Sequence, residues 1–211
     1  MEPRKAYFHL PGLFEFYELY RVFLPLYRTH RDWFYDWCEI GSLYGAPADC
    51  LWGGGRTGCS RHTARPEFRY VVPDFRLNKA FAQLDSLPQP QKDKLEFLCN
   101  ECCWFGCTDR RRCYENVSRR NLGELCPEHR CTAPGAAEGY RFSKAMRNPG
   151  FIGVEDIRST YLPMGFSQFK IEGRGLGSAL VLEFLLYYLT KPEHQLQVRE
   201  EIYLDNMLDL F

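Results

Sequence analysis

The sequence carries no excess of charge of either sign, because 27 lysine and arginine residues balance 27 aspartate and glutamate residues over 211 positions. A chain with this balance has no overall field that would attract nucleic acid. Long apolar runs are also missing: the longest, from Ala179 to Leu189, has 11 residues and includes Glu183. A run of that length is too short to cross a bilayer. We therefore expect no membrane span.

Several common sequence signatures are absent as well. Gly53-Gly54-Gly55-Arg56 could let backbone approach a phosphate, but it has neither the Lys-Ser/Thr of a P-loop nor the spacing of a dinucleotide fingerprint. No Ser-His-Asp pattern of a peptidase is visible, and His129 beside Cys131 is a proximity within one loop. The opening MEPRKAYFHL is not a charged-then-apolar leader, so we expect a reducing, cytoplasmic location.

Cysteine, by contrast, is abundant and concentrated. Seven of the ten cysteines fall in one stretch, at Cys99, Cys102, Cys103, Cys107, Cys113, Cys126 and Cys131. A disulfide framework belongs to small secreted scaffolds, whereas 211 residues with 45% apolar content can bury a core without such bonds. The density of thiols in an expected reducing compartment therefore indicates a metal site.

The spacing leaves the metal open. Cys99 and Cys102 form the only CxxC, and the other close pairs have three or four residues between them. Thiolates at irregular spacing favour an iron–sulfur cluster, whose irons are reached from several loop directions. Zinc bound by cysteines and His129 is the alternative, and free buried thiols are a third.

Short apolar segments alternate with helical patterns along the chain, which predicts an α/β fold with a parallel sheet. We expect strands at 6–10, 38–45, 67–72, 94–98, 151–154 and 166–174, and helices at 13–27, 31–37, 110–122, 156–162, 178–190 and 192–210. In such folds the carboxyl ends of the strands form the site. Four polar stretches fall at expected strand ends: 44–47, 74–78, 99–107 and 170–174.

The segment FKIEGR, residues 169–174, precedes a small-residue turn and an apolar helix, with the cysteines upstream and SLYGAPADCLWGGGR, residues 42–56, near the start. With these features the chain resembles peptidase family U 32, the collagenase-like family, over roughly residues 38–56 and 67–190. The resemblance implies a (β/α)8 TIM barrel or a fold derived from one. It also implies a 4Fe–4S cluster on four cysteines, for which the best candidates here are Cys103, Cys107, Cys126 and Cys131, with Cys99, Cys102 and Cys113 as substitutes.

The chain is short for that fold, since such barrels take about 200 to over 400 residues. We expect a single α/β domain over 1–211 that is an incomplete barrel of five or six strands, with a cysteine-rich insertion at 99–134. The polar stretch at 57–66 looks like the join of an internal deletion. Open sheet edges would then favour a partner chain or self-association.

Lys170, Glu172 and Arg174 alternate along one expected strand and so share a face, with Phe169 and Ile171 on the other. A lysine and an arginine on one face suit a carboxylate or phosphate, and the glutamate could orient either cation or act as a base. The resemblance implies an iron–sulfur enzyme of the oxygen-independent hydroxylase type, acting on RNA or a small aromatic substrate. A collagenase-like protease and a non-catalytic, metal-stabilised binding protein are the alternatives.

Overall fold

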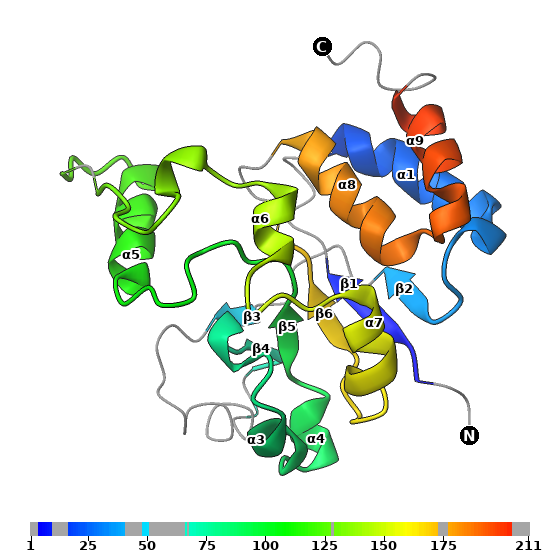
Figure 1. Ribbon diagram of the computed structural model, residues 1–211, viewed down its shortest axis with the longest axis horizontal. Coiled ribbons are helices and arrows are strands. Elements are labelled where there is room, and N and C mark those ends of the chain that lie inside the picture. The colour runs from blue at the N-terminus through cyan, green and yellow to red at the C-terminus, as the bar shows by residue number, and fades with distance from the viewer. Residues whose placement is uncertain are drawn as a thin grey trace.

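The computed structural model describes residues 4–9, 17–40, 48–50, 66, 68–127, 129–172 and 177–203. Its main element is a four-stranded parallel sheet in the order β2-β1-β6-β5 (Figure 1). The strands are β1 (Ala6–His9), β2 (Cys38–Ile40), β5 (Glu96–Leu98) and β6 (Gln168–Lys170). A second parallel pair joins β3 (Ala48–Cys50) to β4 (Tyr70–Val72). The predicted α/β class with a parallel sheet is confirmed.

Helices fill most of the connections between these strands. The longer ones are α1 (Tyr17–Thr29), α5 (Arg110–Asn121), α8 (Ser178–Leu189) and α9 (Gln195–Tyr203). The shorter α-helices are α3 (Phe81–Asp85), α4 (Gln89–Lys92), α6 (Phe142–Met146) and α7 (Val154–Asp156). Four short 3₁₀-helices are described: η1 (Arg31–Trp33), η2 (Phe75–Leu77), η3 (Ala136–Glu138) and η5 (Pro192–His194). The element η4 (Ile157–Tyr161) is a π-helical turn.

The two groups of strands meet at one point. Val71 of β4 forms a parallel bridge with Leu95, and the Val71 N–H donates to the carbonyl of Lys94 at 2.8 Å. The strands therefore follow one another as β2-β1-β6-β5-β4-β3. In this order β1 lies between β2 and β6, and β2 and β3 are the two outer strands. The sheet is not closed in the part of the chain that the structure describes.

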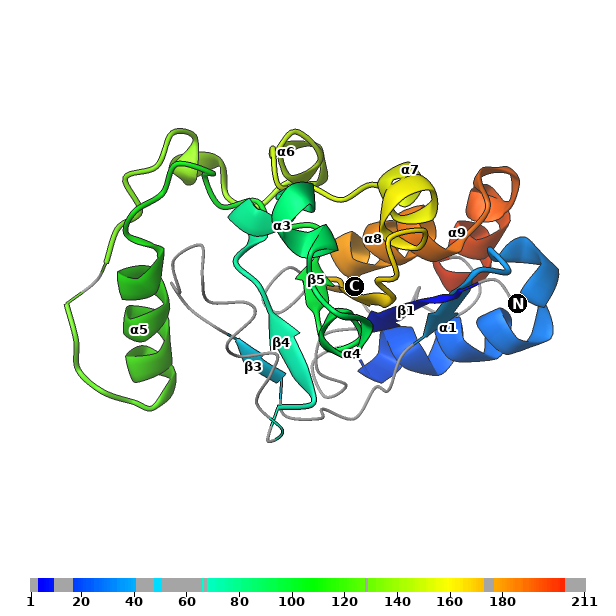
Figure 2. The same cartoon turned by 90° about the horizontal axis from the view of Figure 1, so that it is seen from below.

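The sheet has one aromatic face and one polar face. Phe8, Phe97 and Phe169 occupy matching positions on three adjacent strands, and each is fully buried. Tyr161 of η4 and Tyr188 of α8 pack against them, so the helices cover this face (Figure 2). The opposite side, which we call the polar face, carries Tyr7, His9, Glu96, Gln168 and Lys170.

Two elements differ from those expected from the hydrophobic pattern of the sequence. The helix expected at 13–27 corresponds to α1, which runs from Tyr17 to Thr29 with Pro25 inside it. The strand predicted over 151–154 is wrong, because 151–153 is irregular and α7 begins at Val154. Its extended backbone still contacts the sheet, since the Ile152 N–H donates to the carbonyl of Cys99 at 3.0 Å.

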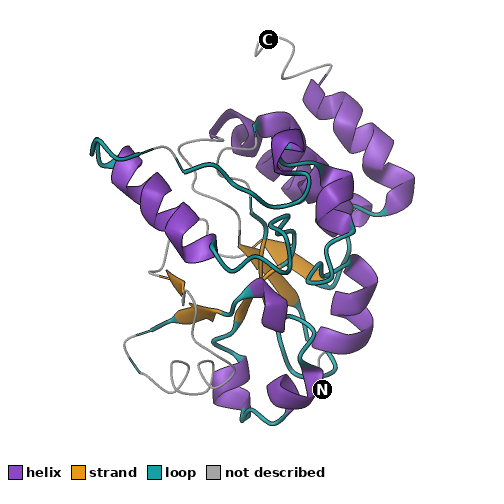
Figure 3. Cartoon of the chain, turned by 60° about the vertical axis from the view of Figure 1, so that its left-hand side comes forward, coloured by secondary structure: helices purple, strands orange, loops and turns teal. Residues whose placement is uncertain are grey.

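The cysteine-rich segment, residues 99–134, leaves the carboxyl end of β5 and extends away from the sheet. Its helix α5 stands off from the sheet and from the group formed by α1, α8 and α9 (Figures 1 and 3). Among the described helices, none is long and apolar enough to cross a membrane.

Candidate functional site

The carboxyl end of β5 delivers a buried acidic residue to the base of the cysteine-rich segment. Glu101 forms an ion pair with Arg110 at 2.5 Å, and the two side chains are 5% and 8% exposed. Arg110, the first residue of α5, also lies over the ring of Phe75 at 4.8 Å. The second carboxylate oxygen, Oε1 of Glu101, accepts from the Cys103 N–H at 2.9 Å. This pair therefore fixes where α5 begins.

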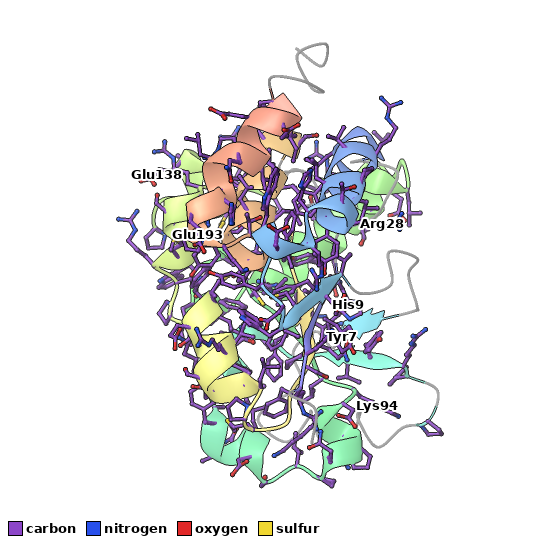
Figure 4. The ribbon with its side chains drawn as sticks, turned by 90° about the vertical axis from the view of Figure 1, so that its right-hand side faces the viewer. Tyr7, His9, Arg28, Lys94, Glu138 and Glu193 are labelled. Carbon is purple, nitrogen blue, oxygen red and sulfur yellow. The ribbon has the colours of Figure 1, made fainter. Side chains whose placement is uncertain are left out.

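A second group of polar side chains lies on the polar face of the sheet. His9 Nδ1 is 3.8 Å from Glu96 Oε1, and Lys170 Nζ is 3.9 Å from Glu96 Oε2. Figure 4 shows His9 and Tyr7 on β1. The side chain of Glu96 is 4% exposed and that of Lys170 is 24% exposed. Burying the Glu96 carboxylate is costly, and the adjacent His9 and Lys170 side chains offset that cost.

Gln168 and Glu96 lie on opposite sides of the His9 ring. The amide nitrogen of Gln168 donates to Ser167 Oγ at 3.1 Å, and in this orientation its oxygen faces His9 Nε2 at 2.8 Å. Because an amide oxygen only accepts, Nε2 is the donor in this arrangement. Nδ1 is then the nitrogen that faces Glu96. The ring of Tyr70 packs against His9, with centroids 4.9 Å apart.

A third group lines a small pocket between the start of α5 and the returning chain. The pocket has a volume of about 60 Å³, and its residues are Trp104, Cys107, Thr108, Asp109, Cys113, His129, Cys131, Thr132 and Ala133. His129 Nε2 lies 3.0 Å from Cys113 Sγ and 3.2 Å from Asp109 Oδ2. We call this the Cys–His pocket. It has room for an ion or a few water molecules.

The Cys–His pocket concentrates groups that repel each other when ionised. Burial raises the pKa of the Cys113 thiol, and the nearby Cys131 and Cys107 thiols and the Asp109 carboxylate raise it further. Each of these groups is negative in its ionised form, so their proximity disfavours the thiolate. A cation in the pocket would reverse that balance.

The four cysteines expected to bind a cluster are divided between different places. Cys107 and Cys131 line the Cys–His pocket. Cys126 Sγ instead lies 3.6 Å from the side-chain nitrogen of Asn116. Cys103 lies beside Glu101 and Arg110, and burial raises the pKa of its thiol. In the described ranges, no group of three or more His, Cys, Asp or Glu side chains is arranged so that it could hold a metal ion.

The expected catalytic residues are only partly within the described ranges. Lys170 lies on the polar face, while Phe169 and Ile171 are fully buried on the aromatic face, as the alternation along the strand requires. The backbone of Glu172 is held at the end of β5 by the side chain of Asn100. Arg174 lies outside the described residues, as do Gly53–Arg56 and the expected join at 57–65.

Sequence reasoning missed His9, Glu96 and the pairing of Cys113 with His129. Glu96 had a signal, since it is an acidic residue in an otherwise apolar strand that runs to Leu98. His9 ends the first strand and was read only as part of it. The pairing of Cys113 with His129 joins residues 16 positions apart and depends on how the chain returns after α5.

No family model matches the chain, and no significant match was found among curated proteins or among solved structures.

Proposed function

We propose that this chain is a shortened, divergent enzyme of the peptidase U 32 type, which binds a small anionic substrate, or an anionic group of RNA, against the polar face of its sheet. The observation that carries the proposal is the buried group of His9, Glu96 and Lys170 on that face. One cation and one base adjacent to a shared carboxylate can hold an anion and transfer a proton.

The strand order supports a fold derived from a (β/α)8 barrel. In such a barrel the strands are parallel and follow chain order around the ring, so the first strand is flanked by the second and the last. Here β1 lies between β2 and β6, and the order continues through β5 and β4 to β3. The aromatic face is covered by helices, as the outside of a barrel is, so the polar face would be the inside.

Each residue of the group has a role that its contacts suggest. Lys170 supplies the positive charge for a phosphate or carboxylate, and its partial exposure allows it to reach one. His9 exchanges a proton at Nδ1, because its Nε2 proton is committed to Gln168. Glu96 lies between His9 and Lys170 and holds both side chains in place.

A 4Fe–4S cluster on Cys103, Cys107, Cys126 and Cys131 does not fit the described geometry. Cys107 and Cys131 share a pocket, but Cys126 contacts Asn116, and Cys103 is held beside the Glu101–Arg110 ion pair. A cluster needs its four thiolates directed at one centre. The proposal therefore includes no step through a cluster and depends on the polar face alone.

Binding to defined anions tests the proposal. Inorganic phosphate, benzoate and a short single-stranded RNA are titrated into the full chain by calorimetry. We expect at least one of them to bind, and Lys170→Ala to lose that binding while Lys170→Arg keeps part of it. Lys79→Ala is the matched control, because Lys79 is an exposed lysine paired with Asp156 away from the polar face.

Two results would overturn the proposal. One is the absence of binding for all three probes to the folded chain. The other is a bound probe whose affinity is the same for Lys170→Ala as for the unchanged chain. Either result, in a folded chain, would mean that Lys170 and the polar face do not form the anion site.

A further inference from the structure

The cysteine-rich segment has few apolar contacts with the rest of the protein, chiefly Phe105 edge-on against Phe75 and the partly buried Cys102 against the core. Of the described residues between Cys99 and Ala145, none contributes a buried hydrophobic side chain to the core. Several apolar side chains in this stretch are instead exposed, with Trp104 at 50%, Val117 at 54% and Leu122 at 79%. Helix α5 has 12 residues, a length at which an isolated helix is marginal in water. Something other than a core must hold it.

The buried ion pair of Glu101 and Arg110 supports only the first residue of α5. Around the remainder of the helix, His129 contacts Cys113 and Asp109, and Arg119 pairs with Glu124. Asn116 adds a further link to the returning chain, since its side-chain nitrogen donates to the carbonyl of Pro127 at 2.7 Å. This contact is exposed, and one exposed hydrogen bond contributes little to stability. The Cys–His pocket lies between these two stretches of chain, at the place where a cross-link would join them.

We propose that Cys107, Cys113, His129 and Cys131 bind a single zinc ion, which fixes the cysteine-rich segment in place. The four residues come from both sides of the pocket: Cys107 from a turn closed by its N–H to the carbonyl of Trp104, Cys113 from the first turn of α5, and the other two from the returning chain. Three thiolates and one imidazole form the Cys₃His set of closed structural zinc sites. This proposal is independent of the polar face.

The distance between His129 and Cys113 suits a single small ion. Two ligand atoms of a tetrahedral zinc site, at the usual Zn–S and Zn–N lengths, are roughly 3.5 Å apart. His129 Nε2 and Cys113 Sγ are 3.0 Å apart, so they need to separate only slightly to admit an ion between them. The pocket of about 60 Å³, lined by the four residues, has room for that ion.

Zinc binding also requires movements that the described conformation has not made, since in the described ranges no three such side chains already form a metal site. Cys107 and Cys131 must rotate toward the ion, and His129 must give up its contact with Asp109 at 3.2 Å. Asp109 is 45% exposed and can turn to solvent. Because the four other residues complete a closed site, we assign Asp109 no ligand role.

Metal analysis of the full chain tests this proposal, with controls taken from the same segment. Zinc, iron and acid-labile sulfide are measured after anaerobic purification, and we expect one zinc per chain with neither iron nor sulfide. Cys113→Ser and His129→Ala should lose most of the zinc. Cys103→Ser and Cys126→Ser should keep it, because these cysteines lie outside the Cys–His pocket. Asp109→Asn should also keep it.

A second measurement avoids relying on variants that could fail to fold. Zinc is removed from the unchanged chain with a chelator and replaced by Co²⁺, whose visible spectrum reports tetrahedral geometry and thiolate ligation. We expect the spectrum of a tetrahedral site with three thiolates. An octahedral spectrum, or no cobalt bound, would overturn the proposal. So would iron and sulfide that are lost in Cys103→Ser and Cys126→Ser, because that result would assign the segment to a cluster.

Discussion

The side chain of Asn100 and the backbone of Glu172 exchange two hydrogen bonds across the carboxyl ends of β5 and β6. Asn100 Nδ2 donates to the carbonyl of Glu172 at 3.0 Å, and the Glu172 N–H donates to Asn100 Oδ1 at 2.7 Å. Just beyond the ends of β5 and β6, the Asn100 side chain thus pairs with the N–H and C=O groups of Glu172 in the way that a neighbouring strand would. Tyr140 O–H donates to the carbonyl of Asn100 and so ties the same point to the chain after the cysteine-rich segment.

Replacement of Asn100 by alanine should destabilise the protein by about 1–3 kcal/mol, because the part-buried N–H and C=O groups of Glu172 lose their partners. The free energy of unfolding measured in urea checks this. Asn100→Asp should cost at least as much, since an ionised carboxylate has no N–H to donate to the Glu172 carbonyl. Asn116→Ala is the control, because its contact with Pro127 is exposed. Equal losses for the Asn100 and Asn116 variants would contradict the prediction.

Two ion pairs on neighbouring residues of α5 differ sharply in burial, which allows them to be compared. Arg110 pairs with Glu101 in the interior, whereas Arg111 pairs with Glu115 on the surface, where the side chains are 79% and 57% exposed. Removing one partner of a buried pair leaves an uncompensated charge and costs about 3–5 kcal/mol. An exposed pair at i,i+4 contributes about 0.3–0.5 kcal/mol.

We therefore expect Arg110→Met to destabilise the protein strongly and Arg111→Met hardly at all. Arg110→Lys should also be costly, because lysine does not reproduce the planar contact with Phe75. Chemical denaturation of each variant, with Glu101→Gln and the double variant added, gives the coupling energy. A coupling as small as that of the Arg111–Glu115 pair would refute the importance of the buried pair.

The sequence allowed the general architecture to be predicted because its signals are local. Alternation in the segment from Phe169 to Ile171 correctly separates the aromatic face from the polar one, and the apolar run from Ser178 gives α8 with nearly correct ends. The predicted strand over 151–154 was wrong because the burial of this segment depends on contacts with a distant part of the chain. Its apolar residues are buried by packing against α8, through Phe151 and Tyr188, and not by pairing within a sheet.

The candidate sites were harder to predict because they combine distant parts of the chain. His9 and Lys170 become neighbours only because β1 pairs with β6, and Glu96 joins them through β5. No local spacing encodes those pairings. The cysteines were conspicuous, but the position of Cys113 in the first turn of α5 and the return of His129 to it depend on tertiary structure.

Asp74 provides a prediction about pH. Burial alone would raise its pKa, but hydrogen bonds from the side chain and backbone of Arg76 outweigh that effect and hold the pKa below its ordinary value. Arg76 Nε and Nη2 donate to the two carboxylate oxygens at 2.8 and 2.6 Å. Arg76 Nη1 also donates to the carbonyl of Cys107 at 3.1 Å, so Asp74 helps to hold the cysteine-rich segment.

A carboxyl group whose pKa is lower in the folded state stabilises that state above its unfolded pKa, which is about 3.9 for aspartate. The stabilisation is lost as the pH falls through the lower, folded pKa. We expect Asp74→Asn to cost about 2 kcal/mol at pH 7, as for hydrogen bonds to a charged group, and the difference from the unchanged chain to shrink below pH 4. Urea denaturation from pH 7 to pH 3 measures this. A difference that stays constant across that range would mean that the Asp74 charge makes no contribution, and that only the shape of the turn at Phe75–Leu77 matters.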